Sequence, residues 1–125
     1  MMIEVRTTAR RQMVDITSRV AAALKGSGDG LCHVFVPHTT AAVVINESAD
    51  PDVARDLTAA YEAMVPSVPF AHAEGNSDAH LLATLLGSSV MVPVEGGRMC
   101  LGTWQGIFFV ELDGPRSRRV RVTRP

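Results

Sequence analysis

The amino-acid sequence predicts an α+β fold: an antiparallel β-sandwich or open barrel of about seven or eight short strands, with two or three helices packed against it. Turn signals crowd the C-terminal half, at 95–98 and 113–115, and separate short runs rich in β-branched residues, as antiparallel hairpins do. Apolar residues recur at helical spacing at 15–25 and 53–64. The length of 125 residues is typical of one domain, so we expect a single domain over 1–125.

The first part of the chain is expected to begin with a strand, a helix and two further strands. The strand at 2–8 is indicated by alternating β-branched residues. The helix at 15–25 has Asp15 as its plausible cap and ends at a glycine-rich turn. Strands at 31–36 and 39–46 follow, separated by a proline that interrupts regular ladder hydrogen bonding.

The remainder of the chain is expected to hold two helices and the hairpin strands. Asp50-Pro51-Asp52 opens a helix that runs to Met64, because proline suits the first helical position and acids favour the first turn. A shorter helix is expected at 79–86, with Ser77 as its N-cap and Gly87 as its stop. The remaining strands are expected at 90–94, 99–101, 107–112 and 118–123.

The charge balance argues against two classes of partner. A net charge of −1 gives no field that attracts nucleic acid or a membrane surface, and we expect neither. No apolar run approaches the ~20 residues of a spanning helix. Five arginines nevertheless crowd the last ten positions, and we interpret them as the solvated face of an edge strand, with anion binding or subunit contact as the alternative: Arg116, Arg118, Arg119, Arg121 and Arg124.

The two cysteines, Cys32 and Cys100, both lie in apolar runs and are expected to be small core residues. Neither has a CxxC partner. The N-terminus has no basic stretch followed by an apolar one, which a secretory signal would show. Together these features predict reduced thiols and a cytoplasmic location.

The densest polar motif is His-Ala-Glu-Gly-Asn-Ser-Asp-Ala-His at 72–80, which holds two of the four histidines. A loop of this kind at a helix start can bind an anion or a metal. The eight-residue spacing of His72 and His80 is not that of a HExxH helix, so a metal site would need another ligand. With His38, three imidazoles could hold Zn²⁺ and leave a position for water; Asn76 could meet His80 on the first turn. The alternative is a capped helix with incidental polar residues.

Two further candidates lie at strand ends. His38 and Thr39 follow a proline, so the imidazole can point out of the sheet, or else bond its own backbone in a turn. Glu47, after Asn46, shares a face with apolar residues if the strand is regular. Such an acid can serve as a general base, because burial raises its pKa. The alternative is that the strand has ended and Glu47 is solvated.

A last unusual cluster, Leu-Gly-Thr-Trp-Gln-Gly at 101–106, contains the only tryptophan. Two glycines bracket Trp104 and Gln105 in an otherwise strand-like run, which suggests a bulge or a close backbone approach. Trp104 could stack on a ring and Gln105 could bind an amide or hydroxyl. The alternative is a core tryptophan beside a bulge.

Four motifs in this order, His-Thr-Thr-Ala-Ala, Ile-Asn-Glu-Ser-Ala-Asp-Pro, His-Ala-Glu-Gly-Asn-Ser-Asp-Ala-His and Leu-Gly-Thr-Trp-Gln-Gly-Ile, resemble the YjbQ family of small bacterial and archaeal proteins, also called secondary thiamine-phosphate synthase. The resemblance covers about residues 3–123. It implies a β-sandwich-like α+β fold and a homotrimer with sites near subunit boundaries. It also implies weak thiamine-phosphate synthase activity, which joins hydroxymethylpyrimidine diphosphate to thiazole phosphate.

Carried over by motif, the resemblance implies a pocket that binds a small phosphorylated molecule. Its catalytic residues would be His38, Glu47 and His80, and its substrate-binding residues Thr39, Asn46, Asn76, Thr103, Trp104 and Gln105. His38, His72 and His80 would bind a divalent metal, for which an imidazole-rich set suits Zn²⁺ better than Mg²⁺. A metal-dependent hydrolase of small phosphates and a non-catalytic metal- or metabolite-binding trimer are the alternative functions.

Overall fold

The computed structural model describes residues 1–125 and has eight strands in two antiparallel sheets, with three helices. The predicted α+β class is confirmed. The five-stranded sheet has the order β1 (Met2–Arg6), β8 (Ser117–Thr123), β3 (Gly30–Phe35), β5 (Ser89–Glu95) and β6 (Arg98–Met99). The three-stranded sheet has the order β2 (Gln12–Asp15), β7 (Gln105–Glu111) and β4 (Ala41–Glu47). The helices are α1 (Thr17–Ala23), α2 (Pro51–Ala63) and α3 (Ser77–Leu86).

The main core lies between the two sheets and α1. Strict alternation in β8 places Val120 and Val122 inward and Arg119 and Arg121 in solvent. This pattern follows from the two-residue period of a strand. Residues from α1 and both sheets complete one buried cluster, among them Val20, Leu24, Cys32, Val34, Val43, Val92 and Phe109.

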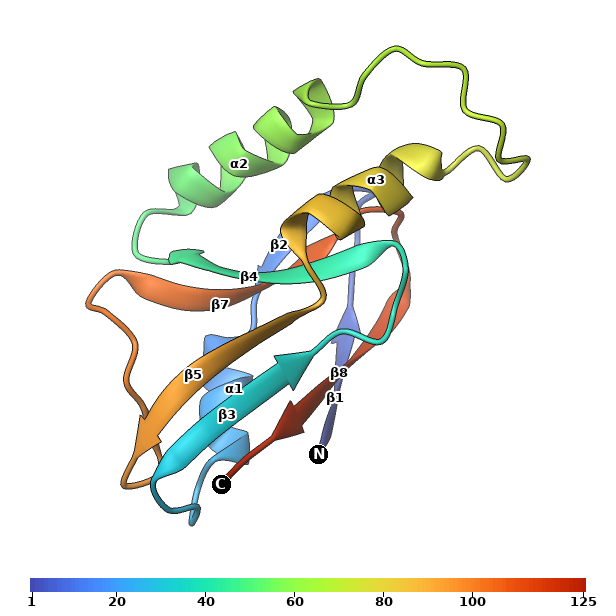
Figure 1. The fold of residues 1–125 in the computed structure, drawn as a ribbon. Helices are drawn as coiled ribbons and strands as arrows, with labels where there is room; N and C mark the ends of the chain where they lie inside the picture. Colours follow the sequence, from blue (N-terminus) through green and yellow to red (C-terminus); the bar gives the residue numbers. More distant parts are fainter.

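Helices α2 and α3 lie on the outer face of the three-stranded sheet (Figure 1). A second, smaller core forms where α3 packs on β4 and β7, and it includes Ala42, Ala79, Leu82, Val110 and Leu112. The longer helix α2 has no fully buried residue. Its start follows the prediction, since Asp50 accepts a hydrogen bond from the Asp52 N–H at 2.9 Å. None of the three helices is long and apolar enough to cross a membrane.

Four local predictions need correction. Residues 12–15 form β2 and pair with β7, so α1 begins two residues later than expected. Asp15 precedes the helix, and its carboxylate accepts the Thr17 N–H at 2.9 Å. Asn76, not Ser77, occupies the N-cap position of α3. Cys100 is exposed, whereas Cys32 is fully buried. The strand expected at 99–101 is the short β6, because the chain leaves the sheet after its hairpin turn.

The pairing of β4 with β7 fixes the geometry of the predicted site. Ala41 faces Glu111 at one end of this ladder, and Glu47 faces Gln105 at the other. A seven-residue strand is about 20 Å long at 3.3 Å per residue. Sequence motifs attached to the two ends of β4 therefore cannot share one small pocket within a single chain.

Candidate functional site

The ten predicted site residues fall into two groups at opposite ends of β4. The histidine end, next to Ala41, comprises His38, Thr39, His72, Asn76 and His80. The tryptophan end, next to Gln105, comprises Asn46, Glu47, Thr103, Trp104 and Gln105. The structure brings His72 and His80 into contact and places Thr39 beside His80, but it holds the two ends a strand length apart.

At the histidine end, two imidazoles meet. His72 lies in the loop before α3 and His80 lies in the helix, and their rings contact edge to face with centroids 5.4 Å apart. His80 also lines a polar cavity of about 350 Å³ together with Thr39 and the C-terminal part of α3. The other lining residues are Ala83, Thr84, Gly87 and Ser88. This cavity offers hydroxyl and imidazole groups but no Lys or Arg side chain.

His38 has a hydrogen bond that limits what it can do. Its Nε2 accepts the backbone N–H of Arg119 at 2.9 Å. This contact follows the last paired residues of β3 and β8, Phe35 and Arg121. An accepting Nε2 places the proton of a neutral imidazole on Nδ1. Burial, followed by the nearby charge of Arg118, lowers the pKa of His38, so the ring is neutral at pH 7. In this geometry His38 is a structural acceptor, and the predicted roles as metal ligand or base would require Nε2 to leave Arg119.

The predicted three-histidine metal centre does not assemble within one chain. No group of three or more His, Cys, Asp or Glu side chains lies close enough to hold a metal ion. His72 and His80 are close, whereas the Nε2 of His38 is engaged by β8. A metal held by the first two imidazoles would need a further ligand from another molecule.

Asn76 connects α3 to the turn after β7. Its Nδ2 donates to Oδ2 of Asp113 at 3.0 Å, and the same oxygen accepts from Arg116 at 2.9 Å. The Oδ1 of Asn76 is buried and has no partner. Asn76 was expected to contact substrate; the geometry also gives it a structural contact that fixes the start of α3.

Sequence reasoning missed the buried charges beneath the histidine end. The interpretation of the C-terminal arginines as the solvated face of an edge strand is wrong for Arg118, which is buried, and β8 lies between β1 and β3. Glu111 and Arg118 form an ion pair, with Arg118 Nε 3.0 Å from Glu111 Oε1, and both residues are almost completely buried. Arg118 also donates to the carbonyl and hydroxyl oxygens of Thr40 at 3.1 and 2.9 Å, and Thr7 donates to Glu111 at 2.6 Å. The motif Glu-Leu-Asp-Gly-Pro-Arg-Ser-Arg at 111–118 was the available signal, since Glu111 ends an otherwise apolar strand.

The tryptophan end is open to solvent. The side chain of Trp104 is 63% exposed, so it is not the core residue that the alternative interpretation allowed. Gln105 turns back to accept the Gly102 N–H at 2.8 Å, and Asn46 accepts the Glu47 N–H at 2.7 Å. Glu47 is half-buried at the end of β4. A Cβ on Gly106 would lie 2.5 Å from Ser48 Cβ, which explains the glycine by close approach, as predicted.

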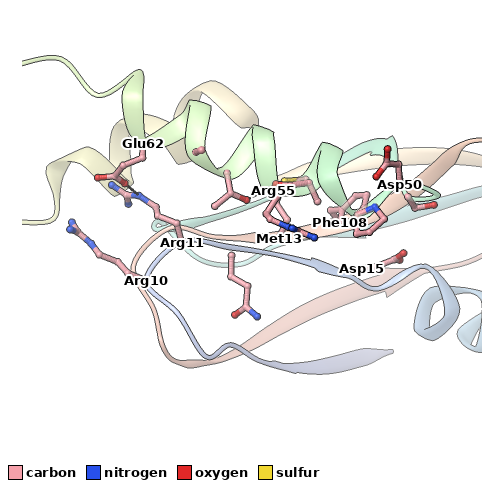
Figure 2. Close-up of a pocket in the computed structure, with 14 residues that line it drawn as sticks. Arg10, Arg11, Met13, Asp15, Asp50, Arg55, Glu62 and Phe108 are labelled. Atoms are coloured by element: carbon pink, nitrogen blue, oxygen red, sulfur yellow. Dashed lines mark hydrogen bonds and ion pairs between the residues drawn. The ribbon is translucent and has the colours of Figure 1, made fainter.

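The largest cavity, about 800 Å³, is a groove between α2 and the strands β2 and β7 (Figure 2). Met13 and Phe108 form its apolar floor, and Arg10 and Arg11 lie near one end with Glu62. Arg11 joins three elements, because it donates to Glu62 of α2 at 2.6 Å, to Asp78 of α3 at 2.5 Å and to the carbonyl oxygen of Leu112. Burial alone would raise the pKa of Asp78, but hydrogen bonds and charges from the arginines lower it overall. The groove carries three Arg and three acidic side chains.

The fold and the histidine end define a two-sheet α+β protein with a small polar pocket beside the C-terminal part of α3. The profile of the family described as "UPF0047 protein YjbQ-like" matches residues 1–124, and the chain belongs to this family. A UPF0047 protein of Methanocaldococcus jannaschii is 44% identical, over 95% of this chain and 88% of its own length. YugU, a UPF0047 protein of Bacillus subtilis, is 45% identical, over 93% of this chain and 91% of its own length.

Solved structures give the same result. A crystal structure of a YjbQ/UPF0047 family protein from Clostridium acetobutylicum has a TM-score of 0.95 and 46% identity, covering 100% of this chain and 99% of that one. A hypothetical protein from Aeropyrum pernix has a TM-score of 0.93 and 43% identity, covering 99% and 96% of the two chains. The predicted family is therefore confirmed. The roles of the individual site residues stay predictions.

Proposed function

We propose that this protein is a weak transferase of the thiamine-phosphate synthase type. In this reaction the C–O bond from the pyrimidine methylene to diphosphate breaks, pyrophosphate leaves, and the thiazole nitrogen forms the new bond to that carbon. The observation that carries the proposal is the histidine-end cavity, where His80 and the hydroxyls of Thr39 and Ser88 surround a space of about 350 Å³. These groups can donate hydrogen bonds to phosphate oxygens.

The chemistry of the cavity is consistent with weak activity. A neutral hydroxyl or imidazole makes a weaker hydrogen bond to phosphate than a charged Arg or Lys does. No cation lines the cavity, so phosphate is held without a fixed positive charge. His72, which contacts His80, is placed to orient that ring. An efficient enzyme would also need groups that stabilise the pyrophosphate leaving group, and one cavity of neutral donors supplies few.

The proposed site includes residues from two copies of the chain. The exposed Trp104 and the neighbouring Gln105 would hold the pyrimidine ring, but they lie a strand length from His80. A homotrimer would resolve this separation by placing the tryptophan end of one copy over the histidine end of the next. In a cyclic assembly, every copy contributes one end to each of two neighbouring sites.

Complementation tests the activity. A strain that lacks thiamine-phosphate synthase is transformed with the wild-type chain, His80→Ala or the control His33→Ala, a half-buried histidine in β3 outside the proposed site. We expect growth without thiamine from the wild type and the control only. Equal growth with His80→Ala, expressed at a normal level, would refute the catalytic role.

Mixed oligomers test the shared site. His80→Ala and Trp104→Ala are each expected to abolish activity alone. Co-expressed in equal amounts, they should restore about one quarter of wild-type activity, because a random cyclic assembly pairs the two intact ends with that frequency. No recovery in a confirmed mixed oligomer would refute a site shared between two copies.

A metal-dependent hydrolase of small phosphates is the second candidate, favoured by the contact of His72 with His80. This candidate requires a third ligand from a neighbouring copy, since one chain gathers only two imidazoles. Metal analysis of the purified protein separates the two functions. Less than about one tenth of an equivalent of Zn²⁺ per chain, with no Zn²⁺-dependent phosphatase activity, would eliminate the hydrolase, because a catalytic zinc site holds its metal tightly.

A further inference from the structure

A separate cavity of about 560 Å³ lies between the end of α1 and the hairpin of β5 and β6, and it shares no lining residue with the cavity at the histidine end. Its walls come from α1, from the residues after that helix, and from the chain that leaves β6 towards the tryptophan end. The lining residues are Thr17, Ala21, Lys25, Gly26, Gly96, Gly97, Arg98, Met99 and Leu101.

This cavity carries positive charge without a compensating acid. Lys25 and Arg98 are its only charged lining residues, and neither lies within 4.0 Å of a carboxylate. Lys25 is the only lysine in the chain. The nearby acids do not line the cavity: Glu95 is the cross-strand neighbour of Arg98, and Asp29 accepts the Gly96 N–H at 2.7 Å. The groove under α2 differs, because its three arginines face three acids.

The hairpin that forms one wall is held in place before any ligand binds. Gly96 and Gly97 have φ values of +57° and +75°, which glycine adopts readily. A Cβ on Gly97 would lie 3.2 Å from the carbonyl oxygen of Leu24, so the turn packs directly on the end of α1. The Asp29 contact fixes the same turn from the other side. Lys25 and Arg98 thus project from two segments whose relative position is set by backbone packing.

The uncharged lining side chains indicate what kind of group could lie beside an anion in this cavity. Ala21, Met99 and Leu101 form a small apolar wall beside the two cations. Thr17 contributes no free donor to an anion, because its hydroxyl already donates to Asp15; the same Oγ1 accepts the Ile107 N–H at 2.9 Å. An anion with a compact apolar or ring substituent would satisfy both parts of this surface.

We propose that the cavity of Lys25 and Arg98 is a binding site for a small phosphorylated molecule, with the phosphate between the two cations and its organic part against Met99 and Leu101. Arg binds phosphate through paired N–H donors and Lys binds it as a point charge. The site is independent of the transfer reaction proposed above, and it does not involve His80 or Trp104.

The test is a titration of the ¹⁵N-labelled full chain, followed by amide chemical shifts, with inorganic phosphate and then with phenyl phosphate. We expect saturable shifts at Gly26, Gly96 and Gly97, and tighter binding of phenyl phosphate than of inorganic phosphate. The double variant Lys25→Gln/Arg98→Gln should bind at least ~10-fold more weakly, since two charge-assisted contacts are lost. Arg121→Gln removes an exposed charge from β8 and should bind as the wild type does.

Wild-type affinity in the double variant would overturn the proposal, and so would an absence of saturable shifts at these glycines in the wild type. A further variant, Glu95→Gln, removes the negative charge of the cross-strand neighbour of Arg98 and should tighten binding. It keeps the proposal testable if the double variant folds poorly. Shifts confined to Thr39, His80 and Ser88 would assign phosphate to the histidine end alone and would also overturn the inference, without affecting the proposed transferase.

Discussion

The two ends of β4 carry similar sequence signals but differ in how the protein uses them. At the histidine end, His38 and Thr40 are bound to β8 by hydrogen bonds, above the buried pair of Glu111 and Arg118. At the tryptophan end, Trp104 is exposed and the polar side chains bond mainly to adjacent backbone. A buried polar group must be satisfied or the fold loses stability, whereas an exposed one is free to serve binding alone. Substitutions at the histidine end should therefore change both function and stability. Substitutions of exposed side chains at the tryptophan end should change function alone.

The largest effect is expected from breaking the buried ion pair. Arg118→Leu leaves Glu111 as an unpaired buried charge and should lower the free energy of unfolding by about 3–5 kcal/mol. Arg121→Leu, an exposed arginine three residues along the same strand, should change it by less than ~0.5 kcal/mol. Urea unfolding followed by circular dichroism measures both.

The same experiment can separate charge from packing. In the double variant Glu111→Leu/Arg118→Leu no unpaired charge remains, so part of the lost stability should return. A cost for Arg118→Leu as small as that of Arg121→Leu would show that the histidine end is not stabilised by this pair, and the contrast between the two ends would fail.

The next largest loss of stability is expected at the tryptophan end, because one position there is tightly packed. Gly106→Ala places a Cβ 2.5 Å from Ser48 Cβ and 2.9 Å from Thr17 Oγ1. Overpacking of this kind typically costs about 1–3 kcal/mol. Ser48→Gly should recover part of that loss when combined with Gly106→Ala, since it removes the nearer contact. Gly28→Ala is the control, because nothing lies within 4 Å of its added Cβ.

A third expected effect is a pH dependence of stability that arises at the histidine end, from the buried carboxylate of Glu111. Burial alone would raise the pKa of Glu111, but hydrogen bonds from Arg118 and Thr7 hold it below the ordinary value of 4.5. A depressed folded-state pKa adds stability that is complete above the unfolded value and is lost as the pH falls through the folded value. Stability should therefore drop below about pH 4.5, and this part of the drop should be absent in Glu111→Gln.

The measurement is the free energy of unfolding from pH 7 to pH 3 in the wild type, Glu111→Gln and the exposed control Glu74→Gln. Parallel curves for the wild type and Glu111→Gln would mean that this carboxylate does not link folding to protons. The control should follow the wild type, because its side chain makes no contact that depends on its charge in the folded state.

Sequence patterns were sufficient for the architecture but not for the assembly of the site. Period-two alternation predicted β8, and Asp50 with Pro51 predicted the start of α2. The separation of His80 from Trp104 depends on the register of β4 with β7, which is set by long-range pairing that local patterns do not encode. Glu111 and Arg118 were missed for the same reason: their seven-residue separation becomes a contact only when β7 and β8 lie in different sheets that face one another.

The smallest expected effect on stability is also the sharpest test of the contrast. Trp104→Ala removes a side chain that is 63% exposed, so little apolar surface returns to water and the free energy of unfolding should change by less than ~0.5 kcal/mol. Leu31→Ala, at 56% exposure on β3, is the matched control for loss of an exposed apolar side chain. Both variants should unfold as the wild type does, but only Trp104→Ala should lose thiamine-phosphate formation. If Trp104→Ala instead costs as much stability as Gly106→Ala, the tryptophan serves the fold, and the tryptophan end is coupled to stability just as the histidine end is.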